Sequence, residues 1–250
     1  MARPAPSRPV ASKPRTPLSR DRVLRTAIGL ADREGIGALT MRRLAGELGV
    51  EAMTLYHYVA NKDEMLEGMI DLVAQEVPFG AGGTDGGADW KSATRARAIA
   101  TRETLLRHPW AGSLWIHSGL GPGRTRYMDS ALRTFREGGL SPDITERVYH
   151  AVENHIFGYT LQAQAFPLAE EDLEAVGTAV LQALPVDEFP FLAEHIGQHL
   201  EKGTLDEGDF EFGLDLILDG VERLAEDERL AEEEARAGRN RKRRSKKPPP

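Results

Sequence analysis

Residues 39–65 concentrate side chains that could bind a nucleic acid. The segment reads LTMRRLAGELGVEAMTLYHYVANKDEM, which predicts two short helices joined by a tight turn at Gly49 and then a helix capped by Asn61. A helix enters the DNA major groove only when a second helix crosses behind it and sets its angle. The small side chain of Ala45 allows that crossing. The spacing therefore favours a helix-turn-helix.

The side chains on the outward face of the second short helix are mostly short, and some are aromatic. Its apolar groups could contact thymine methyl groups, and its hydroxyls could bond to phosphates. Arg42 lies near the start of the first helix and is the best candidate for a guanine contact. Free N–H groups and the helix dipole favour a phosphate at that start. The expected DNA contacts are Thr40, Arg42, Ala52, Met53, Thr54, Tyr56, Tyr58 and Lys62.

Three of these residues have a simpler interpretation. Tyr58 lies three residues after Leu55 and could belong to the core, while Ala52 and Met53 could be inert surface. These alternatives stay open at this point.

Helical periodicity continues through the chain, and no segment alternates like a strand. The sequence predicts an all-α protein with a helix-turn-helix domain over 18–77 and a larger helical domain over 88–235. A basic arm (1–17) and a basic tail (236–250) are expected to be disordered. Helices are expected at 51–59, 88–107, 110–118, 122–138, 142–166, 169–183, 188–201 and 208–235.

Charge is strongly segregated along the chain. Residues 1–62 hold 11 basic and 5 acidic residues, residues 236–250 hold 8 basic and no acidic residue, and the rest carries a net charge of −21. Basic ends on an acidic body suggest that contact with a polyanion is local to those ends.

The segment from Leu39 to Val73 resembles the DNA-binding domain of the tetracycline-repressor (TetR/AcrR) family. The resemblance is carried by the T-x-R-x-L-A-x-x-L-G-V opening, the later T-L-Y and the V-x-N-K before the next helix. RHPW at 107–110 and FEFGLDLILDGVERL at 210–224 resemble the regulatory domain of the same family. The resemblance implies a homodimeric repressor on a palindromic operator, released by a small-molecule effector. An activator and an effector-independent DNA-binding protein remain alternatives.

The resemblance also implies that two helices of each subunit form a four-helix dimer interface. Their wide apolar faces fit this role, although the same residues could be core within one chain. The residues concerned are Ile144, Val148, Ala151, Val152, His155, Ile156 and Tyr159 on one helix and Phe210, Phe212, Leu214, Leu216, Ile217 and Val221 on the other.

The larger domain offers aromatic and polar residues for an apolar or aromatic effector. Ligand pockets combine such residues, although scattered aromatics are more often core. The candidates are Trp110, Trp115, His117, Met128, Asn154, Phe157 and Gln162. No convincing ligand set for magnesium-bound tetracycline is visible, so tetracycline is not the expected effector.

Catalysis has no support in the sequence. There is no Cys, no Gly-rich phosphate loop and no His spacing suited to a metal, so we expect no enzyme activity, cofactor or metal. No apolar run approaches the roughly 20 residues of a membrane span. The expected location is the cytoplasm.

Overall fold

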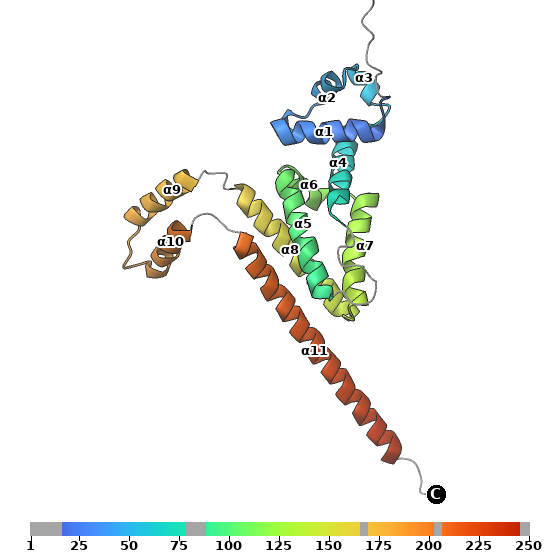
Figure 1. Cartoon of the computed structure of the whole chain (residues 1–250), viewed down its shortest axis with the longest axis vertical. Coiled ribbons are helices and arrows are strands. Elements are labelled where there is room, and N and C mark those ends of the chain that lie inside the picture. The colour runs from blue at the N-terminus through green and yellow to red at the C-terminus, as the bar shows by residue number, and fades with distance from the viewer. Residues whose placement is uncertain (1–16, 79–88, 166–169, 203–206, 246–250) are drawn as a thin grey trace, which may run out of the picture. The chain divides into compact units, whose positions relative to one another are not determined.

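The computed structural model describes residues 17–78, 89–165, 170–202 and 207–245 (Figure 1). Every regular element within these ranges is a helix, which confirms the all-α prediction. The chain divides into two compact units, Met1–Met69 and Ile70–Pro250, with the division inside a helix. Most of the expected arm (1–17) and residues 79–88, at the boundary between the two expected domains, lie outside the described residues.

The first unit is built around α1. Its described elements share one apolar core, to which α1 contributes one whole face, including Val23, Leu24 and Leu30. Leu44 of α2 and Leu55 of α3 complete this core without solvent exposure. The elements are α1 (Arg20–Glu34), the 3₁₀ turn η1 (Ile36–Ala38), α2 (Met41–Leu48), α3 (Ala52–Leu55) and the first part of α4 (Lys62–Glu76).

Side chains cap the starts of α1, α2 and α4, the last at Asn61 as the sequence predicts. Ser19 accepts the Arg22 backbone N–H at 3.2 Å, and Thr40 accepts that of Arg43 at 3.1 Å. At α4, the Asn61 Oδ1 accepts the Glu64 N–H at 2.8 Å, and the Glu64 carboxylate accepts the Ala60 N–H at 2.6 Å. This is a capping box shifted by one residue.

The third helix is shorter than predicted. We expected a helix over 51–59, whereas α3 ends at Leu55 and residues 56–58 form a turn. The Leu55 carbonyl accepts both the Tyr58 N–H at 2.9 Å and the Val59 N–H at 3.1 Å. Aromatic and β-branched residues over 56–59 are poor helix formers, and the burial of Leu55 and Val59 fixes the tighter turn.

The second unit is arranged around α8, which packs against α5, α6, α7 and α11. The pair α9 and α10 pack on each other, with Gly177 close to Leu200. The helices are α5 (Trp90–Arg107), α6 (Ala111–His117), α7 (Pro122–Glu137), α8 (Pro142–Ala165), α9 (Glu170–Ala183), α10 (Pro190–Lys202) and α11 (Glu207–Ser245).

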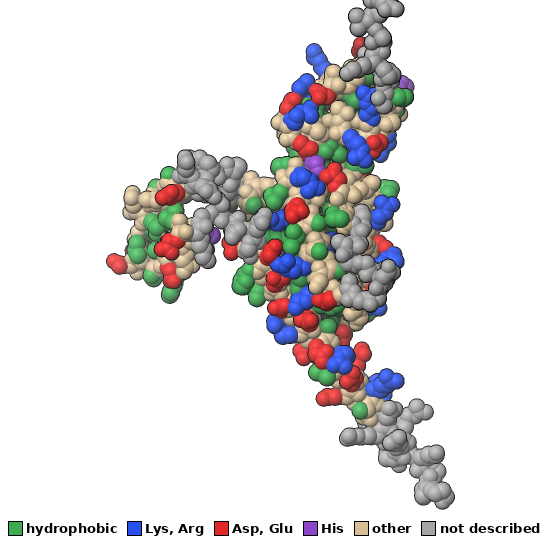
Figure 2. All heavy atoms as spheres, viewed as in Figure 1, with side chains coloured by type: hydrophobic (Ala, Val, Ile, Leu, Met, Phe, Trp, Pro, Cys, Tyr) green, Lys and Arg blue, Asp and Glu red, His purple; other side chains and the backbone are tan. Residues whose placement is uncertain are grey.

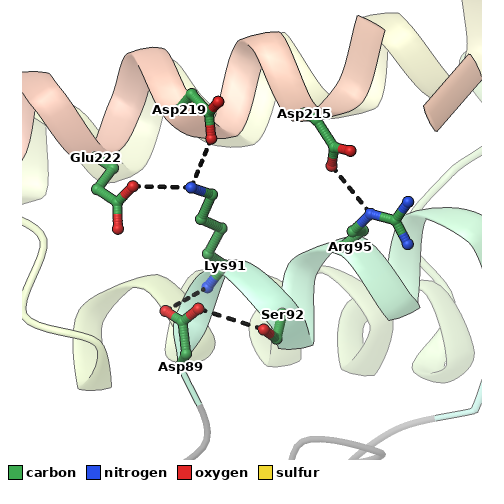
Figure 3. Close-up of polar contacts among 7 residues, drawn as sticks. All are labelled: Asp89, Lys91, Ser92, Arg95, Asp215, Asp219 and Glu222. Carbon is green, nitrogen blue, oxygen red and sulfur yellow. Dashed lines mark hydrogen bonds and ion pairs between the residues drawn. The ribbon is translucent and has the colours of Figure 1, made fainter. Parts of the chain in front are cut away.

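A ladder of ion pairs joins α5 to α11 (Figure 3). The Lys91 Nζ lies 2.5 Å from Asp219 and 2.8 Å from Glu222. One turn further, the Arg95 guanidinium lies 2.9 Å from Asp215, and it also pairs with Glu211. These side chains are partly exposed, so each pair adds little stability alone. Together they follow the contact between α5 and α11.

A buried polar network lies between α5, α7 and α8. Glu153 accepts hydrogen bonds from the Arg97 guanidinium at 3.0 Å and from the Tyr127 hydroxyl at 2.8 Å. The Thr101 hydroxyl lies 3.3 Å from the same phenol oxygen. Burial raises the pKa of Tyr127 far above its usual value, so the phenol stays protonated and can donate to Glu153.

The last helix is longer than predicted. We expected a helix over 208–235 and a disordered tail after it, whereas α11 continues to Ser245. Arg and Lys make up six of the ten added residues (236–245), and both are good helix formers. Arg229 also pairs with Glu226 and Glu233 along the helix. Figure 2 shows acidic and basic side chains mixed along the outer part of α11.

Most of the apolar face assigned to a dimer interface is core within one chain. Val148, Val152 and Ile156 of α8 are buried against other helices of the same unit. Phe210 and Leu214 of α11 are likewise buried. The simpler interpretation is therefore correct for these residues.

Phe212 and Leu216 differ from those residues. They lie one turn apart on α11 and are 67% and 57% exposed.

Gly49 provides a stability prediction. It ends α2 with φ +68° and ψ +37°, a left-handed conformation that costs about 1 kcal/mol for a residue with a Cβ. Gly49→Ala should therefore lower the free energy of unfolding by about 1 kcal/mol. Gly46→Ala is the control, because Gly46 lies inside α2 with open space around it. Equal effects of both changes in urea denaturation would contradict the role of Gly49.

Glu153 provides a second stability prediction. Its side chain is 11% exposed, and Glu153→Ala leaves the Arg97 charge buried without its carboxylate. We expect the free energy of unfolding to fall by about 3–5 kcal/mol. Glu146→Ala, at an exposed position on the same helix, should change it by less than about 0.5 kcal/mol. Similar midpoints for the two variants in thermal unfolding would show that the network adds no stability.

Candidate functional site

Two ion pairs join α1 to α2 at the surface of the first unit. Arg33 of α1 lies 2.8 Å from Glu47 of α2, and Arg43 of α2 lies 2.5 Å from Glu34 of α1. The hydrogen bond from Arg43 lowers the pKa of Glu34, which keeps this carboxylate charged. Ala45 is buried where the two helices meet. The turn at Gly49 and the start of α3 therefore have a defined position in the first unit.

The most exposed apolar side chains of the described first unit lie on and directly after α3. Met53 is 73% exposed, and Tyr56, three residues later, is 45% exposed. Ala52, Thr54 and Tyr58 are half-buried. Tyr58 is thus intermediate between the surface and the core roles considered for it. Exposed apolar side chains close together commonly mark a contact surface.

Two cations beside α3 are available for a ligand. Arg42 and Lys62 are exposed, and neither forms a hydrogen bond or ion pair with the residues that the structure describes. The neighbouring Arg43 differs, because Glu34 holds its guanidinium. Thr40, which caps α2, is also exposed. The helix-turn-helix thus carries cationic, hydroxyl and apolar groups in one short segment, as recognition of DNA requires.

The expected effector residues do not form one cluster in the single chain. Trp115 and Phe157 are buried, and their ring centroids lie 5.8 Å apart. Trp110 is also buried, and its ring lies 6.1 Å from that of His108. Met128 is half-buried on α7.

The remaining three candidates are exposed. His117 bonds to the Ser113 carbonyl at the end of α6, while Asn154 and Gln162 lie on α8. Only part of the expected set therefore surrounds the aromatic core of the second unit.

The sequence analysis missed the polar residues beside Trp115. Tyr127 lies 5.3 Å from Trp115 between ring centroids, and the Arg124 guanidinium lies 5.7 Å from the same ring. Arg97 and Glu153 form an ion pair in the same region. A charged residue inside an apolar helical face was the only available signal, and it does not identify the partner on another helix.

Neither a metal site nor a membrane span appears among the described residues. Their His, Asp and Glu side chains form no group of three suited to a metal ion. No helix within the described ranges is long and apolar enough to cross a bilayer.

Comparison with known proteins agrees with this architecture. Residues 23–69 match the family of bacterial regulatory proteins described as the tetR family, and residues 83–225 match the tetracycline repressor-like C-terminal domain. The chain is 33% identical over 229 residues to the HTH-type transcriptional repressor DrrR1 of Streptomyces coeruleorubidus, covering 84% of this chain and 80% of that protein.

Solved structures give the same result. Apo ActR from Streptomyces coelicolor aligns with a TM-score of 0.72 at 28% identity, covering 85% of this chain and 98% of ActR. ActR in complex with actinorhodin aligns with a TM-score of 0.70 at 30% identity, covering 84% of this chain and 99% of ActR. With both domains matched in order and one repressor similar along most of its length, the chain belongs to the tetracycline-repressor family of bacterial regulatory proteins.

Proposed function

We propose that this protein is a homodimeric transcriptional repressor that binds a palindromic operator and leaves it when a small molecule binds the second unit. The observation that carries this proposal is the exposed surface of Met53 and Tyr56 beside the available Arg42. A core-forming role explains none of these three side chains. Contact with base edges explains all three, because methyl groups and guanine edges lie together in the major groove.

The DNA contacts fall into two classes in this proposal. Arg42, Met53 and Tyr56 reach bases, while Thr40 and Lys62 bond to phosphates and fix the register. Ala52 and Thr54 lie on the base-facing helix, and half-buried Tyr58 supports it through packing and a backbone contact.

A second copy of the chain is proposed to pack on the exposed strip of α11. Phe212 and Leu216 form its apolar part. On the adjacent α8, Asn154, Gly158 and Gln162 are exposed at four-residue spacing, and Gly158 has open space where a side chain would be. Such a smooth face allows close approach of another helix. Two-fold symmetry then requires an inverted repeat in the DNA.

The contacts of α4 suggest how a ligand could affect DNA binding. Within the second unit, Asp71 of α4 accepts the Arg124 backbone N–H at 2.9 Å. A Cβ at Gly121 or Gly123 would overlap Asp71, so the start of α7 lies directly against α4. The Glu76 carboxylate lies 3.1 Å from the His108 Nε2. A ligand that moves α6 or α7 would therefore move the helix that continues into the first unit.

The effector is proposed to be an aromatic small molecule. ActR, a structural relative, has been solved with actinorhodin, and the second unit here contains a cluster of aromatic rings around Trp115.

One alternative has an observation in its favour. The helix α11 extends to Ser245, and residues 236–247 include eight basic residues. These residues could bind DNA without regard to sequence. A steep dependence of affinity on salt with no sequence preference would favour this alternative.

Footprinting on the promoter next to the protein's own gene tests the proposed function. We expect protection of an inverted repeat at physiological salt and loss of protection when an effector is added. A matched fragment with one scrambled half-site should bind at least tenfold more weakly. Absence of a protected repeat at every salt concentration would reject the repressor assignment.

Substitutions in the helix-turn-helix test the contact assignment. Arg42→Ala and Tyr56→Ala should each weaken operator binding by about 1–3 kcal/mol per site, because each removes a base contact. Arg25→Ala is the matched control, since Arg25 is exposed on α1 and pairs only with nearby Asp21 among the described residues. Unchanged affinity of both variants in mobility-shift titrations would refute these contacts.

Substitution on α11 tests the dimer. Leu216→Glu places a charge in the proposed interface, where burying it without a partner is costly, and should shift the protein toward a monomer. Met53→Glu, a similar change at an exposed apolar residue of the first unit, should leave the mass unchanged. Sedimentation equilibrium measures both, and a dimer of undiminished affinity in Leu216→Glu would place the interface elsewhere.

A further inference from the structure

The Nη2 of Arg97 and the Nε of Arg124, both in the second unit, are buried without a hydrogen-bond partner among the described residues. The Arg97 side chain is only 10% exposed, so bulk water does not solvate it freely. Leaving a charged donor unsatisfied in a protein interior costs free energy, and a chain usually retains such a group for a reason other than stability.

The two arginines flank the same aromatic pair. The Arg97 guanidinium carbon lies 5.2 Å from the Tyr127 ring centroid, and that of Arg124 lies 5.7 Å from the Trp115 ring. Tyr127 and Trp115 meet edge to face, with ring centroids 5.3 Å apart. Both unpaired donors therefore belong to one cluster, although they come from different helices.

Tyr149 of α8 gives independent support for this proximity. Burial raises the pKa of Tyr149 to about 12, and the positive charges of Arg97 and Arg124 both oppose this rise. Both guanidinium groups therefore lie within electrostatic range of one phenol. Tyr149 and Arg124 are half-buried, so the cluster reaches the protein surface on this side.

Both guanidinium groups already have partners at other nitrogens. The Glu153 Oε1 accepts from the Arg97 Nη1 and from the Tyr127 hydroxyl. The other arm of Arg124 donates to the Ser118 and Gly119 carbonyls. These bonds hold the guanidinium groups in place and leave the Arg97 Nη2 and the Arg124 Nε as spare donors.

We propose that this cluster binds a planar aromatic molecule bearing a carboxylate or phenolate oxygen, which accepts hydrogen bonds from the Arg97 Nη2 and the Arg124 Nε. The ring of the ligand packs on Trp115 and Tyr127. This inference rests on the proposed ligand-responsive function and adds the chemical class and its polar anchors. An ionised oxygen suits the site, because hydrogen bonds between two charged groups are about twice as strong as neutral ones.

The anchor also has a route to α4. The Arg124 backbone N–H donates to Asp71 of α4. A ligand that accepts a hydrogen bond from the Arg124 side chain therefore binds the same residue that contacts α4. Binding at this cluster and the position of Asp71 are therefore coupled through one residue.

The test uses three probes that share a naphthalene ring. These are 2-naphthoate with an ionised acceptor, 2-naphthamide with a neutral acceptor, and 2-methylnaphthalene with none. Tryptophan fluorescence of the full-length protein, without DNA, reports binding. We expect 2-naphthoate to bind at least tenfold more tightly than 2-methylnaphthalene, with 2-naphthamide between them.

Variants assign the preference to the two arginines. Arg97→Lys keeps one charged donor for Glu153 but loses the second arm, and should weaken 2-naphthoate binding at least tenfold without affecting 2-methylnaphthalene. Arg95→Lys is the matched control, two residues away on α5 and paired with Asp215. Thermal unfolding shows whether Arg97→Lys is folded. If it is not, Arg124→Lys and the charge-neutral double variant Arg97→Gln/Glu153→Gln provide the same comparison.

Three results would overturn the proposal. These are equal affinity for all three probes, unchanged 2-naphthoate affinity in the folded arginine variants, and no binding of any probe to the wild-type protein. Equal affinities would mean that water satisfies the two donors. These binding measurements use no DNA, so their outcome does not depend on the footprinting result. A protein that protects its operator but does not bind 2-naphthoate would be a repressor with another effector.

Discussion

One helix, α4, contributes buried side chains to two separate cores, and the rest of the structure depends on this constraint. Met65 and Met69 are buried in the first unit, while Val73 and Ala74 are buried in the second. The helix cannot end between them, because its backbone hydrogen bonds continue from Lys62 to Glu76. Within the second unit, α4 is contacted at Asp71 by Arg124 and at Glu76 by His108.

The two units use polar groups differently. In the first unit, ion pairs such as Arg33–Glu47 lie at the surface and align helices whose core is entirely apolar. In the second unit, Arg97 and Glu153 are buried in the protein interior. An unpaired charge there is costly, so the two side chains must keep a favourable pairing geometry. A surface pair of the first kind tolerates change, whereas the buried network links α5, α7 and α8 into one arrangement. A ligand that bonds to this network can alter that arrangement.

The sequence was most informative where local rules decide the structure. Asn61 predicted the start of α4, because a cap acts through backbone groups two or three residues away. The exposed positions of Arg42, Met53 and Tyr56 followed from helical spacing around a known turn. Their contacts with DNA stay predictions.

The sequence was least informative where distant residues meet. Leu55 and Val59 end α3 early through tertiary packing, and local propensity alone does not reveal this. Arg97 and Glu153 are 56 residues apart, and no periodicity pairs them. The effector candidates were chosen by residue type, and type does not separate buried Trp115 from exposed Asn154. The charge run after 235 was interpreted as disorder, although α11 continues to Ser245 and most of the added residues are Arg or Lys, which are good helix formers.

In the proposed function, two copies of one helix-turn-helix, held by a dimer of the second unit, read one DNA site. Selection of bound sequences from a random duplex pool by the full-length protein at physiological salt tests it most directly. The account predicts an enriched inverted repeat whose half-site centres are separated by about one helical turn, 10–10.5 base pairs, or somewhat more. Enrichment of a single asymmetric half-site, or of no sequence at all, would contradict it.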